Sequence, residues 1–190
     1  MAELSIDGVS CTYDIRGENA VMLCPPHPEM GGSRYDVRLE RIAGELKKAG
    51  YSTLRFDYLR PFRDGLGEIE DAKKCILYLK ARHELVGLVG YSFGSVVSSN
   101  ISEYCDVLVL ISPMRKINRI ELKNTDVPKL IISAKKDQFV PFEESKEIFS
   151  WLNPPKEFFE VDTDHFYFGK FDVISKKIRE FVESVLRCGD

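Results

Sequence analysis

The chain has 190 residues, of which 44% are hydrophobic and 30% charged, and its net charge is −3 at pH 7. This balance is typical of one globular domain and excludes a disordered chain. No nucleic-acid partner and no membrane span are expected, because the charge is not basic and no apolar run approaches about 20 residues.

The first predicted element is a β-hairpin, with strands over Leu4–Ile6 and Val9–Ile15 and a turn at Asp7 and Gly8. Short apolar runs then alternate with segments of helical periodicity, which is typical of β-α-β units around a parallel sheet. The strands expected there are Ala20–Cys24, Ser52–Phe56, Val86–Val89, Val107–Ile111, Lys129–Ser133 and Glu157–Val161. The sequence therefore predicts one α/β domain over residues 1–190, a three-layer sandwich around a mostly parallel twisted sheet.

Helices are expected between the strands, because apolar residues there recur every three or four positions. The first such stripe runs from Leu39 to Leu46 and stops before Gly50, a residue type that commonly ends helices. Two further stripes consist of Ile69, Ala72, Ile76 and Leu79, and of Phe171, Ile174, Ile178, Phe181 and Val185. We interpret each stripe as the core-facing side of a helix.

The pentapeptide GYSFG places Ser92 between Gly90 and Gly94, after the apolar run LVGLVG and before the helix-compatible segment SVVSSNISEY. This pattern at a strand–turn–helix junction is that of a nucleophilic serine, because the tight turn presents the hydroxyl at the carboxyl end of the sheet. Glycines are needed there because a Cβ would collide with the strand or the helix. We therefore predict that Ser92 is a nucleophile rather than part of a simple turn.

A serine hydroxyl needs a base to accept its proton, and the chain has three histidines. His165 follows the last predicted strand, at the edge of the sheet where Ser92 emerges, and is the predicted base. His83 precedes a strand and is expected on the surface at the opposite edge. His27 lies at the same edge as Ser92 and is the alternative base.

The base in turn needs a carboxylate that fixes its tautomer, and Asp137 is predicted because it follows the strand KLIIS. The other acids considered are Asp57, Asp106, Asp162 and Asp164. The first ends a strand expected across the sheet from His165, and the second introduces a strand instead of ending one. The last two are too close to His165 in sequence to reach its ring easily, and we expect them to shape its loop.

The order Ser92, Asp137, His165 resembles that of the α/β-hydrolase superfamily, as do the segments CPPHPEMGGS, LRFDYLRPFRDG, KKDQFVP and DHFYFGK. The resemblance covers nearly the whole chain and is to small cap-less serine esterases and dienelactone-hydrolase-like proteins. It implies an antiparallel N-terminal strand beside parallel strands. Dienelactone hydrolases use a cysteine nucleophile, so their substrate is not carried over to a chain with a serine.

An oxyanion hole needs two backbone N–H groups that point at the developing charge. Phe93, the residue after the nucleophile, is expected to supply one of them. By the resemblance, His27 in the loop after the first parallel strand supplies the other, with Glu29 or Met30 as alternatives. The neighbouring prolines have no N–H to give.

Together these residues predict a serine hydrolase that cleaves small carboxylic or thiol esters through an acyl-enzyme on Ser92. The segment between Ile111 and Lys129 is too short for a substantial lid, which argues against long acyl chains. The side chains expected to line a small apolar pocket are Met30, Phe139 and Phe166. The alternatives are an acyltransferase or peptidase with the same triad, and a non-catalytic interaction module with this fold.

Neither a metal nor another cofactor is expected, since no two histidines are close in sequence. The five cysteines form no C-x-x-C pair, and one of them, Cys188, lies near the C-terminus. We expect reduced thiols in a cytoplasmic protein, because the N-terminus has no secretory-signal pattern. The expected partner is a small-molecule ester, and both a monomer and a homodimer are compatible with the sequence.

Overall fold

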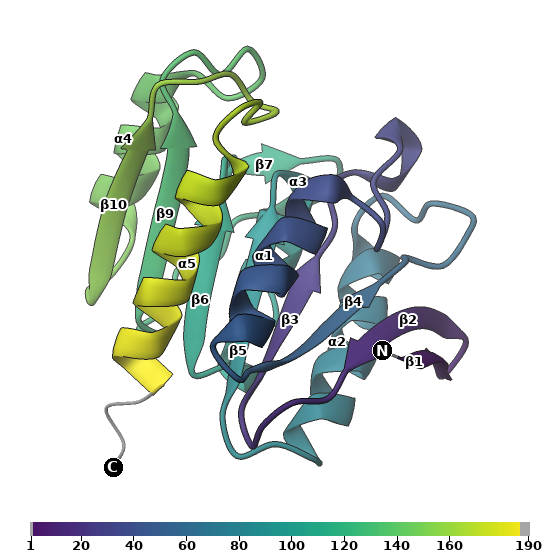
Figure 1. Cartoon of the computed structure of the whole chain (residues 1–190). Coiled ribbons are helices and arrows are strands. Elements are labelled where there is room, and N and C mark those ends of the chain that lie inside the picture. Colours follow the sequence, from purple (N-terminus) through teal and green to yellow (C-terminus); the bar gives the residue numbers. More distant parts are fainter. Residues whose placement is uncertain (1, 187–190) are drawn as a thin grey trace.

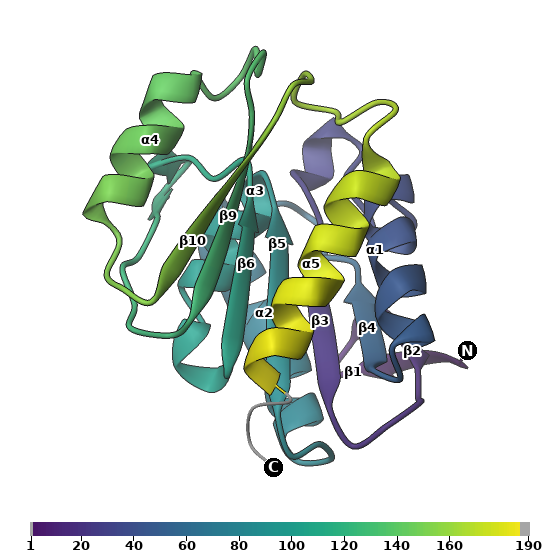
Figure 2. The same ribbon diagram turned by 60° about the vertical axis from the view of Figure 1, so that its left-hand side comes forward.

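The computed structural model describes residues 2–186 and is built around an eight-stranded sheet (Figures 1 and 2). Its strands are β1 (Ala2–Ile6), β2 (Val9–Asp14), β3 (Ala20–Cys24), β4 (Ser52–Phe56), β5 (Val86–Tyr91), β6 (Val107–Ile111), β9 (Lys129–Ala134) and β10 (Lys156–Val161). They lie in the order β1-β2-β4-β3-β5-β6-β9-β10. The β1–β2 hairpin is antiparallel and joins β4 in antiparallel fashion, whereas all later neighbours are parallel. The predicted mostly parallel sheet with an antiparallel N-terminal hairpin is confirmed.

Within residues 2–186, five α-helices cover the two faces of this sheet, which gives the predicted three layers. On one face α1 (Val37–Lys48) lies beside α5 (Phe171–Leu186), as the front of Figure 1 shows. The other face carries α2 (Leu66–Lys80), α3 (Phe93–Ser99) and α4 (Phe142–Trp151). The apolar stripes explain this arrangement, because the side chains from Leu39 to Leu46 that form the first stripe are all buried.

Residues 112–128, between β6 and β9, fold back onto the domain as a small hairpin. It consists of β7 (Lys116–Ile117) and β8 (Ile120–Glu121), and the side chain of Ile120 is buried in the core. This hairpin was not predicted, because its strands have only two residues each. The segment between β6 and β9 therefore forms no substantial lid, as expected from its length.

The carboxyl ends of the central parallel strands meet at one edge of the sheet. In the register of the sheet, Cys24 is paired with Gly90, and Tyr91 with Ile111. Ile111 is paired in turn with Ile132 on β9. The loops that follow β3, β5, β6 and β9 therefore leave the sheet close together, which is where ligands bind in open α/β sheets.

Four cysteines are buried free thiols, as expected: Cys11, Cys24, Cys75 and Cys105. The fifth, Cys188, lies outside the described residues. Burial raises the pKa of the thiols of Cys24 and Cys105, so both are protonated at neutral pH. Among residues 2–186, no helix is long and apolar enough to cross a membrane.

Candidate active site

Ser92 occupies the turn between β5 and α3, in a backbone conformation that few residues other than glycine adopt. Its φ and ψ are 54° and −118°. Its N–H donates a hydrogen bond of 2.8 Å to the carbonyl of Ile111, which ties the turn to the neighbouring strand β6. Strain of this kind persists only where the surroundings fix it, and it is common at functional sites.

The glycines on either side of Ser92 are required by close packing. A Cβ on Gly90 would lie 2.3 Å from the carbonyl oxygen of Gly94, and a Cβ on Gly94 would lie 2.3 Å from that of Cys24. These are the collisions expected from the sequence. Gly94 thus allows α3 to approach the backbone at the end of β3, where the loop with His27 begins.

A Gly94→Ala substitution is expected to lower the free energy of unfolding by about 1–3 kcal/mol, because the methyl group would push α3 and the loop apart. The matched control is Gly44→Ala on α1, where nothing lies within 4 Å of the added Cβ. That control is expected to raise stability by up to about 1 kcal/mol through helix propensity. Urea unfolding of both variants measures the difference, and equal effects would contradict the packing argument.

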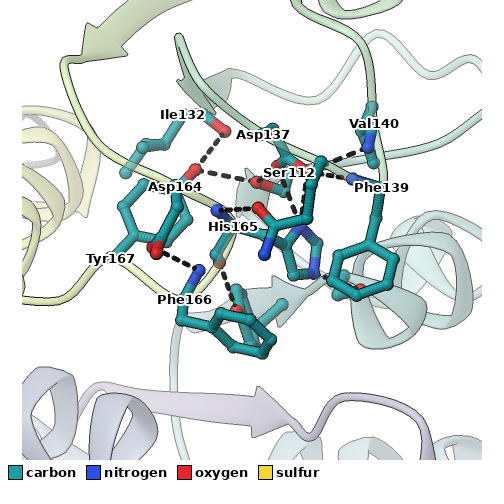
Figure 3. A network of polar contacts seen from close by, with 12 residues as sticks. Ser112, Ile132, Asp137, Phe139, Val140, Asp164, His165, Phe166 and Tyr167 are labelled. Carbon is teal, nitrogen blue, oxygen red and sulfur yellow. Dashed lines mark hydrogen bonds and ion pairs between the residues drawn. The ribbon is translucent and has the colours of Figure 1, made fainter.

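The structure brings Ser92, His165 and Asp137 together at the carboxyl edge of the sheet. Figure 3 shows His165 beside the carboxylate of Asp137. His165 Nε2 lies 3.1 Å from Ser92 Oγ, and Nδ1 lies 2.8 Å and 2.9 Å from the two carboxylate oxygens of Asp137. An ionised carboxylate only accepts hydrogen bonds, so Nδ1 carries the proton. Nε2 is then free to accept the proton of the serine hydroxyl.

The carboxylate of Asp137 is almost completely buried, with 2% of its side chain exposed. Burial alone would raise its pKa, but the hydrogen bonds from His165 and from the N–H groups of Val140 and Phe139 outweigh that effect and hold the pKa below its usual value. Asp137 therefore stays ionised at neutral pH. A further donor, the hydroxyl of Ser112, lies 2.8 Å from Oδ2.

The loop that carries His165 is held by side chains that sequence reasoning missed. Tyr91 donates a hydrogen bond of 2.6 Å to the carbonyl of His165, and Arg38 donates one of 2.7 Å to the Tyr91 hydroxyl. Arg38 also pairs with Asp36 at the N-terminus of α1. Burial raises the pKa of Tyr91, so its hydroxyl remains a donor.

Among residues 2–186, the hydrogen bonds of the His165 ring go to Asp137 and Ser92, and the other acids considered have different partners. Asp106 accepts from the N–H of Val86 at the opposite edge of the sheet, and Asp57 pairs with Arg34 beyond β4. Asp162 pairs with Lys136 at the surface. Asp164 accepts from the N–H of Phe166 and so shapes the loop of His165, as expected.

His83 lies at the opposite end of the sheet, as expected, and its ring makes two hydrogen bonds that were not predicted. It is half-buried, with Nδ1 bonded to the carbonyl of Glu18 and Nε2 bonded to the hydroxyl of Tyr13. These contacts join β2 and the residues before β3 to the segment after α2. They depend on the register of the first hairpin, which cannot be read from the residues around His83.

The ring of His27 is engaged within its own loop. Its Nδ1 accepts from the N–H of Glu29 at 3.2 Å, so Nε2 carries the proton and donates to Asn118 Oδ1 at 3.1 Å. The ring also packs against Phe93, with 4.9 Å between centroids. These contacts favour a structural role for the ring over that of a base.

The loop around His27 also contains the candidates for the second backbone N–H group of the oxyanion hole. The N–H of Glu29 is bonded to the His27 ring, and that of Met30 to the carbonyl of His27 at 3.0 Å. Both alternative donors are therefore engaged within the loop, which favours the N–H of His27. Phe93 is the first residue of α3, so its N–H is one that the helix itself cannot satisfy.

A cavity of about 260 Å³ opens beside Ser92 and His165. Its walls include the three side chains expected from the sequence, Met30, Phe139 and Phe166. Met114 and Ile117 from the segment after β6 complete a mostly apolar lining. Among residues 2–186, no group of three or more metal-ligating side chains could hold a metal ion.

The sequence matches no established family model and no curated protein. Several solved structures have a similar fold over almost the whole of this chain. An α/β serine hydrolase homologue from Coxiella burnetii is 22% identical with a TM-score of 0.84, covering 94% of this chain and 96% of its own. A serine hydrolase without a lid from Xanthomonas campestris is 21% identical, with a TM-score of 0.84 and coverage of 96% and 94%. An esterase from Pyrococcus furiosus is 18% identical, with a TM-score of 0.79 and coverage of 97% and 91%. Across its described residues, this chain therefore has the α/β-hydrolase fold, in a form without a lid domain.

Proposed function

We propose that this protein is a serine hydrolase that cleaves small carboxylic or thiol esters through an acyl-enzyme on Ser92. The observation that carries the proposal is the ring of His165, which is held by Asp137 at Nδ1 and lies 3.1 Å from Ser92 Oγ at Nε2. The fold supports it too, because similar structures are described as serine hydrolases and esterases.

In this proposal Ser92 Oγ attacks the acyl carbon while His165 Nε2 takes the hydroxyl proton. The N–H groups of His27 and Phe93 stabilise the negative oxygen of the tetrahedral intermediate. His165 then gives its proton to the departing alcohol or thiol, which leaves an acyl group on Ser92. Water activated by the same histidine releases the acid and restores the hydroxyl.

A fluorophosphonate probe tests this function directly. The folded protein is expected to be phosphonylated once, and peptide mapping is expected to place the label on Ser92. Heat-denatured protein is the control and is expected to remain unlabelled, since the reactivity depends on His165. A folded protein that stays unlabelled would contradict the proposal and favour the non-catalytic module.

The shape of the site predicts a preference for short acyl chains. A cavity of about 260 Å³ without a lid gives a long chain little apolar surface to bind. Among p-nitrophenyl esters, kcat/KM is therefore expected to be higher for acetyl to hexanoyl chains than for chains beyond about twelve carbons. Initial rates below the critical micelle concentration of each ester measure this ranking. Highest activity on the longest esters would contradict it.

A further inference from the structure

Besides His165 and the N–H groups of Phe139 and Val140, the carboxylate of Asp137 has a fourth hydrogen-bond donor, the hydroxyl of Ser112. We propose that Ser112, oriented by Tyr167, is a positioning residue that fixes the carboxylate of Asp137 and limits how strongly it binds the protonated ring of His165. This inference rests on the proposed function.

The hydroxyls of Tyr167 and Ser112 form a chain of hydrogen bonds in which each donates toward the carboxylate of Asp137. Ser112 Oγ lies 2.8 Å from Asp137 Oδ2 and 2.8 Å from the hydroxyl of Tyr167 (Figure 3). An ionised Asp137 only accepts, so Ser112 must donate its single proton to the carboxylate. Its own oxygen then accepts from Tyr167, whose other potential acceptor, the carbonyl of Ile132, is more distant at 3.4 Å. Successive hydrogen bonds of this kind polarise and strengthen one another.

The backbone at both positions is strained. Among residues 2–186, six non-glycine residues have a positive φ, and three of them are Ser92, Ser112 and Tyr167, with φ of 54°, 45° and 56°. Such conformations are costly in free energy and cluster at functional sites. Here Ser92 presents the nucleophile, Ser112 presents its hydroxyl to the carboxylate of Asp137, and Tyr167 presents its hydroxyl to Ser112. Ser112 is also fixed by its N–H, which donates to the carbonyl of Ile132 at 2.8 Å.

The hydrogen bonds among Tyr167, Ser112 and Asp137 are shielded from water. Ser112 is 1% exposed and Tyr167 is 0% exposed. Burial raises the pKa of Tyr167, so its hydroxyl remains protonated and able to donate. The other charged or titratable groups that face His165 and Asp137 are Tyr91, Arg38, Asp36 and Asp164, and each has the partner described above.

Asp137 Oδ2 accepts hydrogen bonds from both Ser112 Oγ and His165 Nδ1. Without the serine donor, Oδ2 is more basic and holds the imidazolium more strongly, so the free base forms only at higher pH. The carboxylate also loses one of its fixed contacts. For Ser112→Ala we expect kcat/KM at the plateau to fall about ten-fold and the midpoint of its rise with pH to move up by about half a unit.

The test compares three variants, each corrected for the fraction of enzyme that the fluorophosphonate probe labels. Tyr167→Phe is expected to show a smaller shift in the same direction, because Ser112 can still donate to Asp137. Ser133→Ala on β9 is the matched control, since its buried hydroxyl has no partner among the described residues. We expect that control to keep the wild-type rate and pH midpoint.

Proton NMR gives a readout that does not require turnover. The Nδ1 proton of His165 should resonate far downfield, and in Ser112→Ala it should move further downfield as its bond to Asp137 strengthens. If Ser112→Ala does not fold, Ser112→Gly removes the same hydroxyl while relieving the backbone strain at φ of 45°.

An unlabelled wild-type protein would overturn the proposed function, whereas the NMR shift would still support or refute the positioning role. Wild-type enzyme that is labelled, with an unchanged pH midpoint and an unchanged Nδ1 resonance in Ser112→Ala, would overturn the positioning role alone.

Discussion

Ser92→Ala is expected to remove ester turnover and probe labelling while leaving the protein folded. Loss of a serine nucleophile from such a constellation lowers kcat by about 10⁶-fold, because the remaining groups cannot form the acyl-enzyme. The hydroxyl contributes one 3.1 Å hydrogen bond to His165, so the free energy of unfolding should change by no more than about 1 kcal/mol. Steady-state kinetics and urea unfolding measure the two effects.

The matched control for that substitution is Ser175→Ala on α5, which removes a buried serine hydroxyl that donates to the carbonyl of Phe171. This variant is expected to keep wild-type activity. Turnover by Ser92→Ala at more than about one per cent of the wild-type rate would show that another group is the nucleophile.

Asp137→Asn is expected to lower kcat by about 10⁴-fold, and the structure shows why an isosteric change is so damaging. The N–H groups of Phe139 and Val140 both point at Oδ1, so the carbonyl oxygen of the asparagine must take that position. Its NH₂ group then faces His165 Nδ1 and donates to it. The ring proton is forced onto Nε2, where it faces Ser92 Oγ, and the base can no longer accept.

Asp164→Asn is the control for this tautomer argument. The carboxylate of Asp164 accepts from the N–H of Phe166 at 3.0 Å, and the asparagine oxygen can accept in the same way. Its kcat should stay within a few-fold of the wild-type value. A near-wild-type rate for Asp137→Asn would mean that a different carboxylate orients His165.

The framework of the site was predictable because it depends on local patterns. The strands Ala20–Cys24, Ser52–Phe56 and Val107–Ile111 have the predicted bounds, and the first and third of them are continuous apolar runs. A residue in the first positions of the loop after a parallel strand lies at the carboxyl edge of the sheet. That rule alone is enough to bring the loops of Ser92 and Asp137 to the same place.

The supporting network was not predicted, because it depends on how distant segments meet. Tyr91 contacts Arg38 and the backbone of His165, which lie on α1 and in the loop after β10. Ser112 was open to prediction, because it directly follows the strand that ends at Ile111 and so obeys the same rule as Asp137. What the sequence could not reveal is its positive φ and the donor behind it, Tyr167.

The hairpin between β6 and β9 has a consequence for anyone who wishes to build a cover over this site. At its tip, Asn118 bonds to the ring of His27, and the next residue, Arg119, donates its N–H to the carbonyl of Asp64. Residues grafted between these two positions would detach the hairpin from both loops. A variant designed to accept longer acyl chains should therefore have its lid inserted in another loop, for example at the exposed residue Phe168.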